Sequence, residues 1–223
     1  MTRPVLIDGY SGAGGAAMGY HLAGFEVVGV DKAPQPRYPF RFLRADLTTI
    51  GWPELVEFLG AVAVHVSPPC QWATAYRRRG DGVGDGYLNL IPDMRAALAP
   101  LGVATVIENV ESARAHLVNP VRYCGSSFGL DVRRHRMFET NFSLTAPACD
   151  HSWQTPRFTP ASNRTNLRRT VEVGVYRIPL AVQQRAMGID WMRLDELSEA
   201  IPPAYTEHIG RQMLTHLRTE VAA

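Results

Sequence analysis

A stretch of eight residues, Val64–Gln71, places the tightest constraint on how this chain can fold. An apolar strand over Ala61–Val66 is followed closely by the dipeptide Pro68-Pro69 and then by Cys70. Proline fixes φ and has no N–H to donate, so two prolines in a row end a strand abruptly. The sequence therefore predicts a stiff turn that holds the Cys70 thiol at the carboxyl end of a strand. In an open α/β sheet, this edge is where ligands bind.

Cys70 itself allows two interpretations. A lone cysteine is more often a buried packing residue than a reactive one. A thiol on a rigid mount, however, suits a nucleophile that attacks a substrate. The choice between them depends on whether the rest of the chain supplies a cofactor site and an acid.

The chain has 223 residues, which is enough for one α/β domain with a substantial core. Its content of 46% apolar and 20% charged residues is ordinary for a globular protein. The net charge of +2 neither requires nor excludes a polyanionic partner. No apolar run approaches bilayer length, and the first apolar run is too short for a signal peptide. We therefore expect a cytoplasmic protein without membrane attachment.

The three cysteines, Cys70, Cys124 and Cys149, form an odd and sparse set. Such a set argues against a disulfide framework and for a reducing compartment. We assign Cys124 to packing, because no acid or base stands near it in the sequence. Cys149 is closely followed by His151, but two ligands do not make a zinc site, so we expect no bound metal.

A glycine-rich loop, Asp8–Gly15, follows the first apolar strand, Pro4–Ile7. A strand, a glycine loop and then small helix-compatible residues are the layout of a nucleotide-type cofactor site. Glycine lets the backbone turn tightly and approach a ligand closely. The spacing differs from the dinucleotide fingerprint, and many such loops are only turns.

Acidic residues end several of the expected strands. Asp31 ends Gly24–Asp31, where a carboxylate suits the two hydroxyls of a ribose, although an isolated Asp there can also cap a helix. Asp46 stands near the end of Phe42–Leu47 and can accept a hydrogen bond from an exocyclic amine such as that of adenine. Both acids therefore extend the evidence for a nucleotide-type cofactor.

A further carboxylate, Glu108, follows the apolar strand Val103–Ile107. Parallel strands that alternate with helices bring their carboxyl ends to one edge of the sheet. We therefore expect Glu108 and Cys70 to lie on the same edge.

Arginines cluster in three places. If Val132–Phe138 is a strand, Arg134 and Arg136 share a face and form an anion- or carbonyl-binding wall. The run Arg77–Arg79 stands in a glycine-rich loop that suits a mobile lid with phosphate contacts, although a charge run is commonly only a solvated surface. The third cluster lies in residues 143–176, a polar stretch without periodic apolar residues that we interpret as a small loop-rich insert.

Taken together, these residues resemble the cytosine-5 DNA methyltransferase family. Five segments match the motifs of that family in order and cover most of the chain outside residues 143–177. The segments are Tyr10–Gly15, Pro69–Gln71, Glu108–Val110, Arg134-x-Arg136 and Pro202–Gly210. The resemblance implies an α/β, Rossmann-like class I methyltransferase fold, with a seven-stranded, mostly parallel sheet and helices on both faces. It also implies a catalytic domain over 1–142, a small target-recognition insert over 143–177 and a return segment over 178–223.

The same resemblance implies methyl transfer from S-adenosylmethionine to cytosine in double-stranded DNA, with no obligate protein partner. The catalytic residues would be Cys70, Glu108, Arg134 and Arg136. The cofactor contacts would be Tyr10, Ser11, Gly12, Gly14, Gly15, Asp31, Lys32, Asp46, Leu47, Pro69 and Glu199. The DNA contacts would be Gln71, Arg77, Arg78, Arg79, Arg133, Arg164, Arg168 and Arg169.

Three alternatives stay open. The first is modification of RNA cytosine by the same residues, since RNA offers splayed loops rather than duplex bases. The second is a non-catalytic DNA-binding protein, against which the intact Cys70, Glu108, Arg134 and Arg136 speak. The third is transfer of a different group from an altered sulfonium cofactor, because Glu199 stands where the family has Asn.

Overall fold

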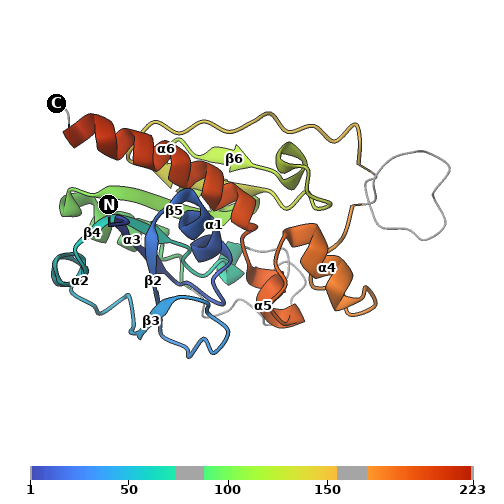
Figure 1. Cartoon of the computed structure of the whole chain (residues 1–223), viewed down its shortest axis with the longest axis horizontal. Helices are drawn as coiled ribbons and strands as arrows, with labels where there is room; N and C mark the ends of the chain where they lie inside the picture. The colour runs from blue at the N-terminus through green and yellow to red at the C-terminus, as the bar shows by residue number, and fades with distance from the viewer. Residues whose placement is uncertain (1, 74–87, 155–169, 222–223) are drawn as a thin grey trace.

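The computed structural model describes residues 2–73, 88–154 and 170–221, and its centre is a seven-stranded sheet (Figure 1). The strands are β1 (Val5–Gly9), β2 (Glu26–Asp31), β3 (Arg41–Arg44), β4 (Ala61–Val66), β5 (Ala104–Val110), β6 (Val121–Tyr123) and β7 (Arg136–Thr140). Their order across the sheet is β3-β2-β1-β4-β5-β7-β6. Strands β1 to β5 run parallel, whereas β7 is antiparallel to both β5 and β6. The predicted seven-stranded, mostly parallel α/β sheet is confirmed.

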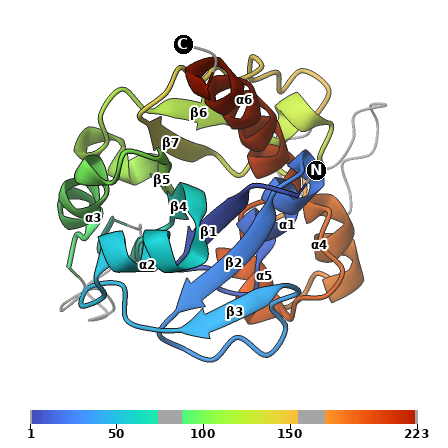
Figure 2. The same ribbon diagram turned by 60° about the vertical axis from the view of Figure 1, so that its left-hand side comes forward.

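Helices cover both faces of this sheet (Figure 2). They are α1 (Gly15–Ala23), α2 (Trp52–Leu59), α3 (Ile91–Leu98), α4 (Leu180–Met187), α5 (Leu194–Glu199) and α6 (Pro203–Val221). Helices α1 and α6 lie against one face, and α2 and α3 lie against the other. None of the helices in the described part of the chain combines the length and the apolar composition needed to cross a bilayer.

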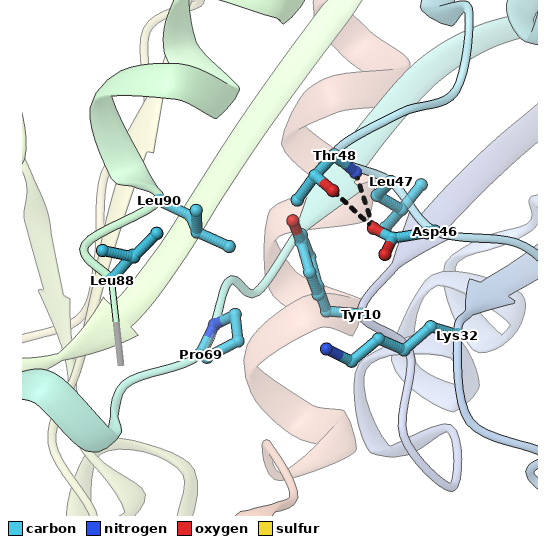
Figure 3. Close-up of a pocket in the computed structure, with 8 residues that line it drawn as sticks. All are labelled: Tyr10, Lys32, Asp46, Leu47, Thr48, Pro69, Leu88 and Leu90. Carbon is cyan, nitrogen blue, oxygen red and sulfur yellow. Dashed lines mark hydrogen bonds between the residues drawn. The ribbon is translucent and has the colours of Figure 1, made fainter. Parts of the chain in front are cut away.

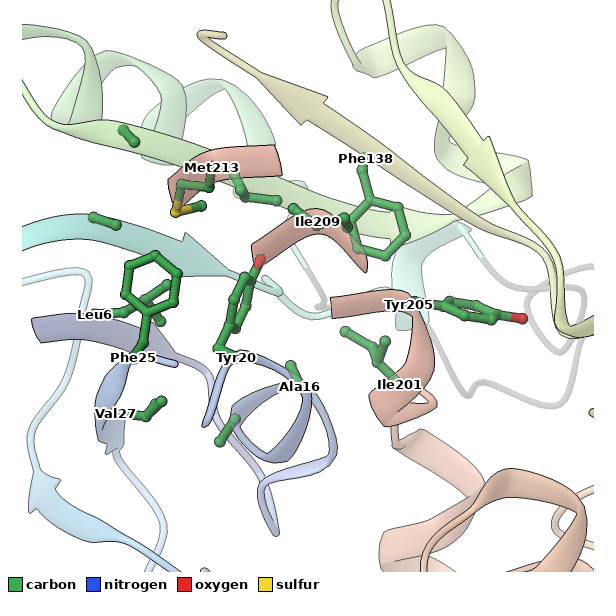
Figure 4. Packing of buried hydrophobic residues seen from close by; sticks show 14 of the residues in the cluster. Leu6, Ala16, Tyr20, Phe25, Val27, Phe138, Ile201, Tyr205, Ile209 and Met213 are labelled. Carbon is green, nitrogen blue, oxygen red and sulfur yellow. The ribbon is translucent and has the colours of Figure 1, made fainter. Parts of the chain in front are cut away.

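Alternating side chains of the central strands supply two separate cores. Leu6 of β1 packs with Tyr20 of α1 and Ile209 of α6, in the cluster drawn in Figure 4. The next residue of β1, Ile7, belongs instead to the core under α2 and α3, together with Met94. Successive side chains of a strand point to opposite faces, so a strand buried on both faces is apolar throughout. This explains why the central strands read as continuous apolar runs in the sequence.

Two strands have boundaries different from those predicted. Strand β5 continues through Val110, so Glu108 lies within the strand and not after it, because β7 pairs with β5 along this segment. Strand β7 begins at Arg136, not at residue 132, since Arg134 has φ +35° and interrupts the extended backbone. The predicted strand that would place Arg134 and Arg136 on one face is therefore wrong.

The described parts of residues 143–177 contain no helix and no strand longer than a single bridge. This agrees with the prediction that the segment is loop-rich. The apolar side chain of Val171 packs with Ile178 and Met187 in a third, smaller core beside α4 and α5.

Candidate active site

Neighbouring strands β4 and β5 bring Cys70 and Glu108 to the same edge of the sheet. The register pairs Val66 with Ile107, one residue before Glu108. The Asn109 Nδ2 donates a hydrogen bond of 2.9 Å to the carbonyl of Pro68, so β5 fastens the turn that carries Cys70. The charge of Glu108 contributes to raising the pKa of the Cys70 thiol, as expected for two groups at the same edge of the sheet.

Glu108 is almost fully buried and is paired with Arg136. The Arg136 Nε lies 3.1 Å from Oε1 of Glu108. Burial raises the pKa of the Glu108 carboxyl, because a charged carboxylate is poorly solvated there, while Arg136 and a hydrogen bond from Ser67 oppose this shift. A carboxyl of this kind can hold a proton at a higher pH than an exposed glutamate.

A chain of buried polar groups continues from Ser67 into the core. The Ser67 hydroxyl lies 2.8 Å from Nε2 of His65, whose Nδ1 lies 2.9 Å from the Tyr20 hydroxyl. Burial lowers the pKa of His65 to about 3, so the imidazole is neutral at physiological pH. A neutral imidazole has one donor and one acceptor, and donation from Nε2 to Ser67 leaves the Ser67 proton free to bond Glu108.

Sequence reasoning missed His65 and Ser67 as parts of the site. The signal was present, because the two residues are separated by one position at the end of a strand and side chains at such positions share a face. A histidine in an otherwise apolar strand indicates a buried polar contact, and His65 is such a residue.

The Cys70 thiol is half-buried and its pKa is raised. Burial is the largest cause, and the negative charges of Glu108 and Glu199 add to it, whereas Arg136 acts in the opposite direction. The reduced, neutral thiol is therefore favoured near pH 7, and ionisation requires added positive charge or loss of a nearby negative charge.

Arg134 lies close to this site but is held by backbone carbonyls. Its Nε donates to the carbonyl of Ala200 at 2.8 Å, and a terminal nitrogen donates to that of Ser198 at 2.6 Å. Burial lowers the pKa of Arg134 to about 9, so the side chain is still a cation at neutral pH. Arg134 thus fixes the end of α5, which carries Glu199, next to the sheet edge.

A pocket of about 320 Å³ opens beside the turn that carries Cys70 (Figure 3). Five of the eight residues that line it were predicted as cofactor contacts. These five are Tyr10, Lys32, Asp46, Leu47 and Pro69, and the other three are Thr48, Leu88 and Leu90. Because Pro69 is bonded to Cys70 in the chain, the pocket and the thiol share one rigid turn.

The chemistry of the lining fits a nucleoside-containing cofactor. Tyr10, Leu47 and Pro69 supply apolar surface for a flat ring, and Figure 3 shows the Tyr10 ring between Pro69 and Asp46. Burial raises the pKa of Tyr10 to about 12, so its ring carries a neutral phenol. Asp46 supplies a carboxylate that already accepts hydrogen bonds from the Thr48 amide and hydroxyl at 3.0 and 2.7 Å. The volume and the mixture of apolar walls with a few polar groups are typical of small-molecule sites.

The glycine loop stands close to this pocket. Gly12 has φ +48°, and a side chain added there would meet open space, which leaves the backbone accessible. The amide of Gly12 donates to Oδ2 of Asp31 at 3.1 Å, so Asp31 shapes the loop. Gly15, in contrast, has the carbonyl of Ile201 where a Cβ would sit, and its lack of a side chain serves packing.

The remaining predicted site residues are distributed as follows. Ser11 is buried within the loop, Gly14 precedes α1 and packs against Tyr38, and Glu199 is exposed at the end of α5. Gln71 begins a short 3-10 turn after Cys70, and Arg133 is half-buried near His151. The predicted DNA contacts Arg77, Arg78, Arg79, Arg164, Arg168 and Arg169 lie outside the described residues.

Comparison with known proteins gives structural matches only. No family model and no curated protein sequence matches the chain. A protein described as a DNA modification methyltransferase encoded within a prophage (E. coli) matches with a TM-score of 0.62 and 15% identity, over 96% of this chain and 99% of the other. The Dnmt2 methyltransferase of S. pombe matches with a TM-score of 0.57 and 14% identity, over 96% and 99% of the two chains.

A third match is the methyltransferase EhMeth of Entamoeba histolytica, with a TM-score of 0.59 and 13% identity over 97% of this chain and 99% of the other. Identities this low relate folds and not activities. The chain therefore has the fold of these methyltransferase structures along almost its whole length.

Proposed function

We propose that this chain is a DNA cytosine-5 methyltransferase that uses S-adenosylmethionine. The single observation that supports the proposal best is the grouping of Cys70, Glu108 and Arg136 at one sheet edge, next to the pocket that contains Pro69. A thiol, a carboxyl of raised pKa and a cation are the groups that activation of a cytosine ring requires.

Carbon 5 of cytosine is a poor nucleophile until the ring is activated. The Cys70 thiolate adds to carbon 6, and the electron pair of the double bond moves to carbon 5, which then attacks an electrophilic methyl group. Loss of the carbon-5 proton to water and departure of the thiolate restore the aromatic ring. The net products are 5-methylcytosine and the demethylated cofactor.

Glu108 and Arg136 act on the charge that develops during thiolate addition. A protonated Glu108 donates to the ring nitrogen beside the exocyclic amine, which neutralises the electron density that the thiolate pushes into the ring. Arg136 stabilises both the thiolate and the carboxylate that remains after proton transfer, because it pairs with Glu108 and its positive charge lowers the pKa of Cys70. Arg134 serves as a positioning residue through the backbone of Ser198 and Ala200.

The pocket around Tyr10 and Asp46 would hold S-adenosylmethionine, which supplies the electrophilic methyl group when bound. Tyr10 and Leu47 would contact the adenine ring, Asp46 its amine, and Asp31 with the Gly12 backbone the ribose side. Placing the cofactor against Pro69 would direct the methyl group toward the base attached to Cys70.

The target cytosine must leave the duplex before Cys70 can reach carbon 6. We propose that Gln71, next to the nucleophile, fills the vacated space in the base stack. The arginines Arg77–Arg79 and Arg164, Arg168 and Arg169 would contact phosphates, which orient the duplex without reading its sequence.

The test measures transfer of a labelled methyl group from S-adenosylmethionine to unmethylated genomic DNA, followed by nucleoside mass spectrometry. We expect labelled 5-methylcytosine with duplex DNA, and a loss of at least about 1,000-fold in the Cys70→Ala variant, because covalent activation has no substitute. The melting temperature of Cys70→Ala serves as the folding control. A tRNA substrate assayed in parallel distinguishes the RNA alternative.

A second measurement tests the covalent step directly. DNA that contains 5-fluorocytosine has no carbon-5 proton to lose, so the Cys70 adduct should persist on a denaturing gel. A preparation that methylates DNA but forms no such adduct, or Cys70→Ala protein that still methylates, would refute the mechanism.

A further inference from the structure

Four side chains outside the proposed active site form a compact group of metal-ligand type. They are Cys124, His135, Cys149 and His151, and one ligand atom from each lies within 4.8 Å of all the others. The cluster lies at the start of β7, because His135 directly precedes that strand and Cys124 directly follows its partner strand β6. The sequence offers only Cys149 and His151 as ligands at this position, and the fold adds Cys124 and His135 as two further candidates from distant positions.

The distances within the cluster match a site closed around one small ion. The Nε2 of His151 lies 2.9 Å from Sγ of Cys149 and 3.2 Å from Sγ of Cys124. The Nε2 of His135 lies 3.4 Å from Sγ of Cys149. Tetrahedral Zn²⁺ with Zn–S near 2.3 Å and Zn–N near 2.1 Å separates its ligand atoms by roughly 3.4–3.8 Å, so small rearrangements suffice.

A carboxylate bonded to one of the histidines supports a metal site rather than an ordinary cluster of polar side chains. The Nδ1 of His135 lies 2.9 Å from Oε2 of Glu111, and the other oxygen of Glu111 lies 3.2 Å from Arg122. A carboxylate on the far nitrogen of a histidine fixes the ring and directs the near nitrogen at a metal, as in carboxylate–histidine–zinc arrangements. Ser126 contacts Cys124 Sγ at 3.2 Å, as outer hydroxyls do around thiolate ligands.

We propose that Cys124, His135, Cys149 and His151 bind one structural Zn²⁺ ion. Two soft thiolates and two imidazoles in a closed tetrahedral set select Zn²⁺ over hard cations such as Mg²⁺. Four protein ligands leave no open position for substrate, so the ion has a structural role. It joins the hairpin of β6 and β7 to residues 149–151, which lead into the remainder of the insert.

The position of His135 relates this ion to the sheet edge. His135 stands between Arg134, which holds the end of α5, and Arg136, which pairs with Glu108. A metal bond to His135 would therefore restrict the backbone that carries both arginines. This role does not depend on which reaction the site performs.

The test is the metal content of the whole 223-residue chain, expressed without an affinity tag in zinc-supplemented medium and measured by elemental mass spectrometry. We expect one Zn²⁺ per chain in the wild type. The Cys70→Ala variant, which lacks the cysteine outside the cluster, is the matched control and should also contain one Zn²⁺. Cys149→Ser and His151→Ala should each lower the zinc content at least tenfold. A chelator should lower the melting temperature of the wild type but not of these two variants.

Two further readouts apply to the wild type alone, in case a variant fails to fold. Co²⁺ substituted for Zn²⁺ should give the intense visible absorption of a tetrahedral site with thiolate ligands. In the zinc form Cys70 should be the only cysteine that a thiol reagent modifies, and the chelator should make the other two thiols reactive as well. Wild-type protein that contains less than a tenth of an equivalent of zinc, or that carries a Cys124–Cys149 disulfide, would overturn the proposal.

Discussion

At the scale of single residues, three neighbouring groups, Cys70, Glu108 and Arg136, shift the pKa values of the thiol and the carboxyl. Glu108 raises the pKa of Cys70, and Arg136 opposes both the Cys70 shift and the Glu108 shift. Before substrate binds, the thiol is therefore neutral at pH 7, and the pKa of the Glu108 carboxyl lies above that of an exposed glutamate. In the proposed mechanism, addition of the thiolate and protonation of the base would therefore both depend on the same buried carboxyl.

This coupling predicts opposite effects for two substitutions. Glu108→Gln removes a negative charge, so the pKa of Cys70 should fall, whereas Arg136→Gln removes a positive charge and should raise it. The pH dependence of Cys70 alkylation, followed by mass spectrometry of the Cys70 peptide, measures both shifts. Equal midpoints in all three proteins would mean that the groups do not interact.

Glu108→Gln should also slow methyl transfer. An amide can donate a hydrogen bond but cannot deliver a proton, and general acid catalysis typically contributes a factor of about 10² to 10⁴. The decrease should appear in kcat, measured with saturating DNA and cofactor. An unchanged kcat would remove Glu108 from the mechanism while leaving the role of Cys70 open.

At the scale of elements, the contact between α1 and α6 sets where the return segment sits. A Cβ added to Gly19 would lie 2.1 Å from both the carbonyl of Pro203 and Oγ1 of Thr206. The Thr206 hydroxyl in turn donates to the carbonyl of Ala16 at 2.8 Å, which joins the two helices directly. The backbones approach this closely only because position 19 has no side chain.

Gly19→Ala should therefore destabilise the protein even though alanine favours a helix by up to about 1 kcal/mol. Overpacking against a backbone carbonyl costs about 1–3 kcal/mol, so the steric effect should win. Urea unfolding measures the change in the free energy of unfolding. Leu22→Ala, at an exposed position of the same helix, is the control and should change stability little; a Gly19→Ala variant as stable as this control would show that the helices can separate without cost.

At the scale of the whole molecule, the centre of the sheet contains an ionisable group that must stay neutral. His65 is fully buried and its pKa is lowered to about 3 from 6.5. The unfolded chain therefore binds a proton at this position between these two pH values, whereas the folded protein does not. Stability contributed by the neutral imidazole is complete above pH 6.5 and is lost as the pH falls below it.

His65→Gln should therefore flatten the acid dependence of stability. In the wild type this group alone should remove about 2 kcal/mol from the free energy of unfolding between pH 8 and pH 5, at about 1.4 kcal/mol per pH unit below pH 6.5. Urea unfolding of both proteins at the two pH values isolates the difference, since the carboxylates are common to both. Curves that stay parallel would show that His65 titrates normally in the folded protein.

Local signals in the sequence determined much of the scaffold. Strand β4 has the bounds that the sequence predicts. Helix α2 has local signals at both ends, with Pro53 in its first turn and Gly60 in the left-handed conformation after its last residue. The stiff turn after Ala61–Val66 and the shared edge of Cys70 and Glu108 could also be predicted, because they follow from proline geometry and from parallel strand order.

Features that depend on contacts between distant parts of the chain could be seen only in the tertiary structure. Pairing with β7 extended β5 past Glu108. Arg134 has a positive φ outside β7, and its side chain donates to the backbone at the end of α5. The fold also brought Cys124 and His135 to Cys149 and His151, although 27 positions separate Cys124 from His151. The sequence by itself determined strands, turns and their order, since these depend on neighbouring residues. The cysteine–histidine cluster and the hydrogen bonds from Tyr20 through His65 and Ser67 to Glu108 depend on side chains that meet only when distant strands, helices and loops pack together.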